Sequence, residues 1–449
     1  MTSLLSAPRT ALTFRVLEPG FDGEATLSLR YQITGPEGAV LAEFDETVVL
    51  PGEAVAERDE AEFTRISRLL ALAASASYYK SCIPATVEVP GGLSAAERRF
   101  LVELTRQGLA EFAYRNDVPE ALHPRIVAPE LPETPAARRT DAPPRRPLIA
   151  VGGGKDSIVT IEAVRALSPD VTLFSVNEYE PIRDTATHAG LPLTVARRRL
   201  DARLFDLNAA GALNGHVPVT AINSLIGALT ALRSGYDAVI FSNEASSSFG
   251  NLHWEGVDVN HQWSKGIECE SLVRDLVDGP TLRYLSFLRP LSELAITRQF
   301  ARLSDYHPVF TSCNRAFHLD AGKRRRWCGD CPKCRFVFLC LAPFISREAM
   351  LAIFTGRDLL ADPTQREGFL ELLNAGERLK PFECVGEPDE CRAALTLLSR
   401  HPDWADHPFL ADPEVAACLV GDAVIDASFV FHDAHFLPAE FEKAVRGLL

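Results

Sequence analysis

The stretch that decides the fold reads Ile149-Ala150-Val151-Gly152-Gly153-Gly154-Lys155-Asp156-Ser157. It lies where a short apolar run ends and a helical pattern, Ile158 to Leu167, begins. Three consecutive glycines let the backbone come close to an anion, and the free amides at the start of the helix point toward it. The stretch therefore predicts a strand, an anion-binding loop and a helix in succession.

Two common phosphate-binding motifs do not match this loop. A Walker A loop requires Ser or Thr after Gly-Lys and a glycine five residues earlier, where this chain has Asp156 and Ile149. The dinucleotide-binding fingerprint also fails, because Ser157 stands where that motif has glycine. Asp156 would repel a phosphate unless a cation lay between them, so it predicts Mg²⁺ in the site. The alternative is a plain strand-to-helix turn that Asp156 and Ser157 cap.

Short apolar runs alternate with helix-length segments beyond residue 147, which is typical of an α/β fold with a parallel sheet covered on both faces. The runs are Pro147 to Val151, Val171 to Val176, Leu191 to Val195 and Ala238 to Phe241. Before them, alternating residues from Leu12 to Val49 indicate antiparallel strands, and helical patterns follow at Glu60 to Tyr79 and Ser94 to Tyr114. The expected organisation is an N-terminal α+β domain (1–115), a proline-rich linker (116–147), an α/β domain (148–345) and a mostly helical C-terminal region (346–449).

The composition limits what the protein does. The chain has 449 residues, 60 acidic and 46 basic side chains, and a formal net charge of -14. Such a balance disfavours nucleic acid as a partner. The longest apolar run, Phe336 to Ile345, is about half of what a bilayer span needs, and Met1 to Thr13 lacks a secretory signal pattern. We therefore expect a cytoplasmic protein with no membrane partner; the sequence leaves the oligomeric state open.

Cysteines gather in one short region. Cys328, Cys331 and Cys334 follow one another at two-residue gaps, with Cys313 before them and Cys340 after them. Four thiolates at such spacings suit a tetrahedral structural Zn²⁺, with Cys313 or Cys340 as the fourth ligand. An iron–sulfur cluster or free thiols are the alternatives.

Polar side chains crowd the segment that follows the run ending at Phe241. They include Glu244, His261 and Lys265, each of which could move a proton or hold a carboxylate, although the sequence does not rank them. The end of a buried strand is where open α/β sheets bind ligands, while a solvated loop is the plainer alternative. Two further candidates for the site are Asn223 or Ser224 on an apolar helix, and the segment Lys380 to Glu387 as a cover.

The hexapeptide Gly152 to Ser157 resembles the pyrophosphate loop of the PP-loop ATP pyrophosphatases, apart from glycine in place of the usual first serine. This resemblance implies a HUP-like nucleotide-binding fold, and ATP held by Gly152, Gly153, Gly154, Lys155, Asp156 and Ser157. It also implies adenine contacts at the end of the second strand, near Asn177, although Asn177 could equally cap the next turn. The similar cysteine pattern of the 7-cyano-7-deazaguanine synthases favours Cys313 as the fourth zinc ligand.

The wider pattern resembles the UDP-N-acetylmuramoyl-L-alanyl-L-glutamate epimerases. It comprises the glycine-first loop, Ser242-Asn243-Glu244, Asn260 to Lys265 and Arg326 to Phe344. This resemblance implies an ATP-dependent epimerase of peptidoglycan precursor synthesis, which acts on a small nucleotide-sugar dipeptide through an acyl-adenylate and releases AMP and pyrophosphate. Such an anionic substrate requires a local basic face, for which Arg197 to Arg199 and Lys323 to Arg326 are candidates.

Three other functions fit parts of the pattern. They are an adenylating ligase, such as an amide or nitrile-forming enzyme; a tRNA-modifying enzyme, which the charge of -14 disfavours; and a nucleotide-binding module without chemistry. Within the epimerase hypothesis the proton carriers are unassigned. Cofactor-independent glutamate racemases use paired cysteines, which gives Cys313 or the Cys328 group a rival role if they hold no metal.

Overall fold

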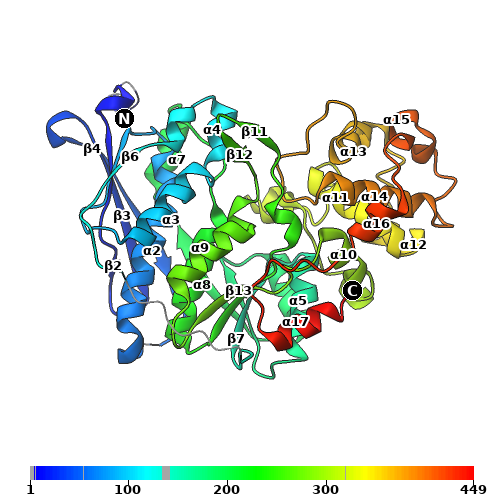
Figure 1. Cartoon of the computed structure of the whole chain (residues 1–449), viewed down its shortest axis with the longest axis horizontal. Helices are drawn as coiled ribbons and strands as arrows, with labels where there is room; N and C mark the ends of the chain where they lie inside the picture. Colours follow the sequence, from blue (N-terminus) through cyan, green and yellow to red (C-terminus); the bar gives the residue numbers. More distant parts are fainter. Residues whose placement is uncertain (1–4, 6, 54, 134–141, 319) are drawn as a thin grey trace.

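The computed structural model describes residues 5, 7–53, 55–133, 142–318 and 320–449. Its described strands form an eleven-stranded mixed sheet and a separate two-stranded hairpin (Figure 1). The sheet has the order β13 (Arg283–Ser286), β10 (Ala238–Phe241), β7 (Pro147–Ala150), β8 (Thr172–Val176), β9 (Leu193–Arg199), β4 (Val40–Val49), β3 (Thr26–Thr34), β1 (Thr13–Val16), β5 (Thr86–Glu88) and β6 (Arg125–Val127), with β2 (Gly20–Phe21) beside β3.

The five strands from β13 to β9 are parallel, as the sequence predicts for this region. The chain leaves β7 toward β8 and β9, and then crosses to the other side of β7 to form β10 and β13. The strand order therefore reverses between β7 and β10. In open parallel sheets a ligand crevice forms at such a reversal, outside the carboxyl ends of the strands.

Successive residues of the central strands point into two different cores. Leu148 and Val239 belong to a core on one face of the sheet, whereas their neighbours Ile149 and Ile240 belong to a core on the other face. This explains why these strands read as continuous apolar runs rather than as alternating patterns. The first core receives α2 (Glu60–Tyr79), α3 (Ala95–Arg106), α4 (Ala110–Asn116), α7 (Ala202–Ala209), α8 (Val219–Ser234) and α9 (Ile267–Val277), and the second receives α5 (Lys155–Arg165), α6 (Glu180–Ala189), α10 (Glu293–Ala301) and α11 (Pro332–Leu341).

The N-terminal strands and the parallel strands form one sheet, because β4 pairs with β9 in antiparallel register. The sequence predicts a domain boundary between residues 115 and 148, but a single hydrophobic core runs from the N-terminal strands to α8 and α9. Part of the expected linker is built into this unit: Val118 and Leu122 are buried, and β6 extends the sheet. Residues 134–141 of that segment lie outside the described residues. Residues 1–4 and 6, which belong to the N-terminal stretch expected to lack a secretory signal, also lie outside them.

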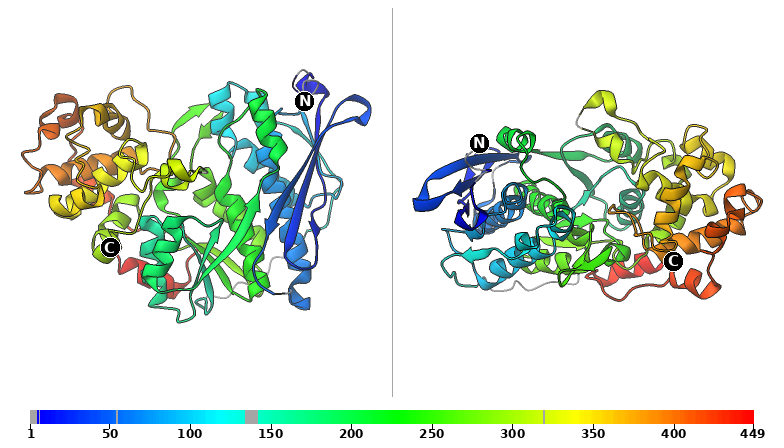
Figure 2. Two further views of the ribbon diagram at one scale, coloured as in Figure 1. Left: turned by 180° about the vertical axis from the view of Figure 1, so that it is seen from behind. Right: turned by 90° about the horizontal axis from the view of Figure 1, so that it is seen from above.

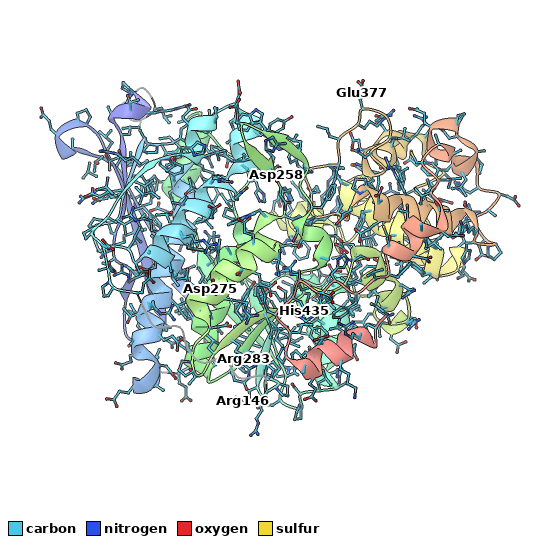
Figure 3. All side chains as sticks on the ribbon, viewed as in Figure 1. Arg146, Asp258, Asp275, Arg283, Glu377 and His435 are labelled. Atoms are coloured by element: carbon cyan, nitrogen blue, oxygen red, sulfur yellow. The ribbon has the colours of Figure 1, made fainter. Side chains whose placement is uncertain are left out.

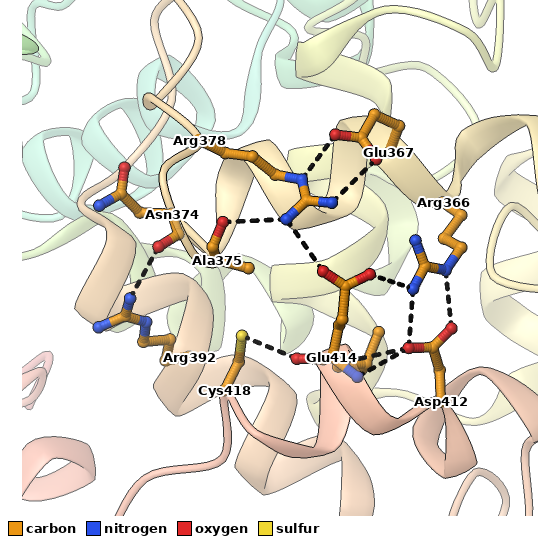
Figure 4. A network of polar contacts seen from close by, with 10 residues as sticks. Arg366, Glu367, Asn374, Ala375, Arg378, Arg392, Asp412, Glu414 and Cys418 are labelled. Atoms are coloured by element: carbon orange, nitrogen blue, oxygen red, sulfur yellow. Dashed lines mark hydrogen bonds and ion pairs between the residues drawn. The ribbon is translucent and has the colours of Figure 1, made fainter.

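The C-terminal region is helical, as expected, and forms the end of the molecule opposite the N-terminal strands (Figures 1 and 2). Its helices are α12 (Arg347–Ile353), α13 (Arg366–Leu372), α14 (Pro388–Ser399), α15 (Pro413–Ala416), α16 (Asp422–Ala427) and α17 (Ala439–Arg446), the last of which packs back against α5. Arg366 joins α13 to α15 by pairing with Asp412 and Glu414, and Arg378 pairs with Glu367 and Glu414 (Figure 4).

No helix in the described ranges combines the length and apolar character that crossing a bilayer requires.

Candidate functional site

A cavity of about 410 Å³ opens at the carboxyl ends of β7, β8 and β10, where the strand order reverses. At the opposite ends of these strands, Arg146, which precedes β7 and is labelled in Figure 3, pairs with Asp170 at 2.8 Å and donates its backbone N–H to Asp237. The cavity is lined by Ala150, Val151, Gly152, Gly154, Lys155, Asp156, Ser157, Phe174, Ser175, Val176, Tyr179, Ile182, Thr220, Asn223, Phe241, Ser242, Asn243, Lys265, Glu293, Thr311, Ser312, Phe317, Lys333, Phe336, Val337 and Cys384.

The glycine loop adopts a backbone that its sequence permits. Gly153 has a φ of 81°, and a Cβ there would lie 3.0 Å from the Pro181 carbonyl oxygen, so a side chain is excluded on both counts. A Cβ at Gly152 would meet nothing within 4 Å, so the missing serine does not reflect a lack of space. The loop is fixed from outside, since Thr311 donates its backbone N–H to the Gly153 carbonyl at 2.9 Å. Gly154 caps the N-terminus of α5.

Lys155 and two carboxylates form a buried ion cluster at the base of the cavity. The Lys155 ammonium contacts both Asp156 and Glu293. Burial opposes the lysine charge, but the two carboxylates outweigh it and raise its pKa. Burial, together with the charge of Asp156, raises the pKa of Glu293 well above its usual range. Glu293 is the first residue of α10, and nothing in its local sequence marks it as a site residue.

The three candidate proton carriers occupy different places. Lys265 lines the cavity, and although burial disfavours its charge, Cys384 and Glu244 raise its pKa. Glu244 is buried behind the wall, where its Oε1 has no hydrogen-bond partner among the described residues. His261 is outside the lining set and hydrogen-bonds through Nδ1 to Glu111 Oε2 at 2.6 Å. Only Lys265 therefore faces the cavity directly.

Besides Glu293, two more lining residues with ionisable side chains had not been singled out as site candidates. Lys333 is in the first turn of α11, beside the cysteine group, and Cys384 is in the segment that joins α13 to α14. Burial disfavours the Cys384 thiolate, but Lys265, Lys333 and His261 outweigh it and lower the pKa of this thiol to about 6. The segment Lys380 to Glu387 was expected as a cover, but no spacing within it distinguished Cys384.

Other sequence candidates divide between the cavity and the core. Asn223 lines the cavity, whereas Ser224 points inward and hydrogen-bonds to the Tyr284 hydroxyl at 2.9 Å. Ser175 and Val176 line the cavity, but Asn177 does not. The Asn177 side chain accepts the Arg198 backbone N–H at 3.0 Å, which is a bond to the neighbouring strand β9 and not to the turn that follows β8.

Neither arginine run lines the cavity. Arg198 forms a buried pair with Glu46, and Arg326 pairs with Asp184. Arg324 contacts a lining residue, since its guanidinium carbon lies over the Tyr179 ring, 5.4 Å from the ring centroid. The ammonium groups that face the cavity are instead Lys155, Lys265 and Lys333.

The four cysteines Cys313, Cys328, Cys331 and Cys334 bring their Sγ atoms within 4.8 Å of one another. Three of the Sγ pairs are 4.0, 3.7 and 3.5 Å apart. Zn–S bonds of about 2.3 Å in a tetrahedron require sulfur separations of about 3.8 Å, so the group fits a Zn²⁺ ion. Cys340 is not part of this group; it is buried beside Cys391.

Comparisons with known proteins agree with this architecture over most of the chain. The model of the MurL N-terminal domain matches residues 6–287, and that of the MurL C-terminal domain matches residues 309–420. A protein of Salinispora tropica named UDP-N-acetyl-alpha-D-muramoyl-L-alanyl-L-glutamate epimerase is 46% identical over 436 residues, which are 95% of this chain and 93% of that protein. Proteins with the same name from a Micromonospora species and from Xanthomonas oryzae pv. oryzae are 45% and 43% identical, over 94% and 88% of this chain and 94% and 87% of their own lengths. The chain therefore belongs to the MurL family.

Proposed function

We propose that this chain epimerises the terminal L-glutamate of UDP-N-acetylmuramoyl-L-alanyl-L-glutamate to D-glutamate in an ATP-dependent reaction of peptidoglycan precursor synthesis. The name that its three relatives share supports the substrate and the inversion. One observation supports the ATP dependence: the glycine loop, three ammonium groups and Cys384 face one cavity. A nucleotide on the loop and the carboxylate of a second substrate would meet there.

We assign the loop to the PP-loop class and the parallel half of the sheet to a HUP-like nucleotide fold. In this proposal the backbone amides at Gly152 to Ser157 receive the polyphosphate of ATP, with Lys155 adding positive charge. The substrate α-carboxylate attacks the α-phosphorus, which forms an acyl-adenylate and releases pyrophosphate. After inversion at Cα, water releases AMP and the D-glutamyl product.

The chemistry gives a reason to couple ATP to inversion. Removing the Cα proton beside a free carboxylate builds a second negative charge next to the first. At 4 Å and an effective dielectric of about 20, such a repulsion costs about 4 kcal/mol. Adenylation removes the first charge and makes the carbonyl a better acceptor for the electron pair. The ammonium groups of Lys265 and Lys333 face the same cavity and can stabilise the resulting oxyanion.

Two metal ions fit the residues present. Asp156 offers a partly exposed carboxylate in the cavity, and its oxygen suits Mg²⁺, which when bound would offset the phosphate charge. Cys313, Cys328, Cys331 and Cys334 would hold a structural Zn²⁺. That group lies between Thr311 and Ser312 on one side and α11 on the other, so it would fix two parts of the cavity wall.

Incubation in D₂O with ATP, Mg²⁺ and the UDP-muramoyl dipeptide tests the proposal. We expect a D-glutamyl product with deuterium at Cα, together with AMP and pyrophosphate. Omission of ATP, or its replacement by α,β-methylene-ATP, serves as the control and should abolish exchange. Pyrophosphate release without exchange would contradict the epimerase, and AMP release that depends on an added amine would indicate an adenylating ligase. If no muramoyl peptide causes pyrophosphate release, the remaining hypothesis is a nucleotide-binding module without chemistry.

A further inference from the structure

Cys384 is held over the cavity by hydrogen bonds to its neighbours on both sides along the chain. Asn251 Nδ2 donates to the Lys380 and Pro381 carbonyls, at 3.1 Å each. Gln262 Nε2 donates to the Val385 carbonyl at 3.0 Å. Both donors belong to the polar segment that follows β10. The thiol is therefore placed in the cavity wall by a braced segment rather than by a free loop.

His261 connects this thiol to the N-terminal half of the chain. Its Nδ1 is hydrogen-bonded to Glu111 of α4, which is buried and also pairs with Arg115 at 2.7 Å. Burial opposes a charge on His261, but its interactions with Cys384 and Glu111 raise its pKa to about 9. The His216 ring lies tilted against His261 with ring centroids 4.4 Å apart, and burial together with the charge of His261 lowers the pKa of His216 to about 4. One charged and one neutral imidazole therefore lie side by side.

We propose that Cys384 is the base that removes the Cα proton of the adenylated glutamyl residue, with His261 as its positioning partner and Glu111 orienting the imidazole. The inference rests on the proposed function. In this step the Cα–H bond breaks, an S–H bond forms on Cys384, and the electron pair of the C–H bond moves onto the acyl carbonyl oxygen. The electron pair then returns from the oxygen to Cα, which takes a proton from solvent on the opposite face, and the Cys384 thiol loses its proton to solvent, which restores the starting charges.

The surroundings favour a base over a nucleophile. The acyl group is already activated by adenylation, so a thioester would add a step without further activation. A thiolate whose pKa lies near 6 is ionised at neutral pH, and a proton acceptor works best when its pKa is close to the working pH. Nucleophilicity falls as the thiol pKa falls. The thiols of Cys313, Cys328, Cys331 and Cys334 face one another instead, and none of them lines the cavity.

Replacement of the thiol separates its role from adenylation. We expect Cys384→Ser to keep the ATP- and substrate-dependent release of pyrophosphate within about threefold, and to lower deuterium exchange at Cα and product formation by about 10³-fold. Cys418→Ser is the matched control, because Cys418 is remote in the C-terminal helices, and it should leave both rates unchanged (Figure 4). Exchange at the wild-type rate in Cys384→Ser would overturn the inference. Absence of both pyrophosphate and exchange in the wild type would instead refute the proposed function.

A second measurement does not depend on the folding of that variant. Iodoacetamide reacts with the thiolate, so alkylation of Cys384 in the wild-type protein, followed by peptide mass spectrometry, should rise with a midpoint near pH 6. In His261→Gln the midpoint should move upward, because a cation that lowers the thiol pKa is lost. A midpoint near 8.5 in the wild type, or a Cys384 thioester trapped by acid quenching during turnover, would contradict the assignment as base.

Discussion

At the scale of single residues, two glycines of the loop differ in how strongly the structure requires a glycine at their position. Gly153 is needed for its positive φ and for its close approach to Pro181, whereas Gly152 has open space where a side chain would go. The charged residues behind the loop are constrained by burial: Lys155 contacts both Asp156 and Glu293, so it keeps one carboxylate partner if the other is removed. Asp156 is the more exposed of the two carboxylates and faces the cavity.

We expect Asp156→Asn to lower pyrophosphate release at least about 100-fold, because the change removes a carboxylate aimed at the polyphosphate and its cation. Asparagine keeps the shape, and Lys155 retains Glu293, so the fold should persist. The measurement is pyrophosphate release at saturating ATP over a range of Mg²⁺ concentrations. Asp170→Asn, an exposed change at the opposite edge of the sheet, is the matched control. Full activity in Asp156→Asn at low Mg²⁺ would refute the metal role.

At the scale of elements, the cavity wall depends on how α11 begins. Cys331 is the N-cap of α11, and Cys334 is in its first turn together with Lys333, which faces the cavity. Cys313 follows directly after Thr311 and Ser312, which line the same cavity and contact the glycine loop. A metal ion at these thiols would therefore tie the loop and the start of α11 to a common point.

We expect the purified protein to contain about one zinc per chain by elemental analysis, and Cys328→Ser to lose it. The lost cross-link should lower the unfolding temperature and weaken ATP binding measured by calorimetry, since the wall loses its anchor. Cys418→Ser should keep the metal. Loss of zinc with unchanged ATP affinity would show that the wall is fixed without the ion, and iron in place of zinc would overturn the metal assignment.

The sequence predicts elements best where their pattern is local. The helix Glu60–Tyr79 and the strand Ala238–Phe241 have the expected bounds. The expected helix from 94 to 114 is broken into α3 and α4 at Gly108, where a Cβ would lie 2.4 Å from the Leu104 carbonyl oxygen and 3.0 Å from Pro218. The contact with Leu104 is local, so the glycine itself was an available signal for the break, whereas the approach of Pro218 comes from a distant segment.

The same distinction applies to the candidate site. The glycine loop and the cysteine group are short motifs that residue spacing makes visible. Glu111 meets His261, Glu293 meets Lys155, and Cys384 interacts with Lys265, each across more than a hundred residues of sequence. Each of the three is an ordinary residue in its own segment. Their chemistry depends on burial and on one another's charges, which are properties of the folded chain only.

At the scale of the whole molecule, the N-terminal strands and the parallel strands are parts of one sheet. The junction between β4 and β9 carries a buried ion pair, in which Arg198 bonds to Glu46 through two nitrogens at 2.6 and 3.2 Å. Glu111 adds a second connection by holding His261 from the N-terminal half. In the proposed mechanism the first 115 residues therefore contribute to the site through Glu111, a role that composition alone did not suggest.

We expect Glu46→Gln to destabilise the whole molecule by about 3 kcal/mol, because Arg198 is left buried without its counter-charge. The matched control is Glu43→Gln, an exposed change on the same strand, for which little effect is expected.

The unfolding of the two halves should be cooperative. When urea unfolding is monitored by hydrogen exchange, peptides of β3 and β10 should lose protection at the same denaturant concentration, in both the wild type and Glu46→Gln. A shared core and a shared sheet leave no surface along which one half could separate first. Loss of protection in β3 well before β10 would show that the junction at β4 and β9 is a domain boundary after all.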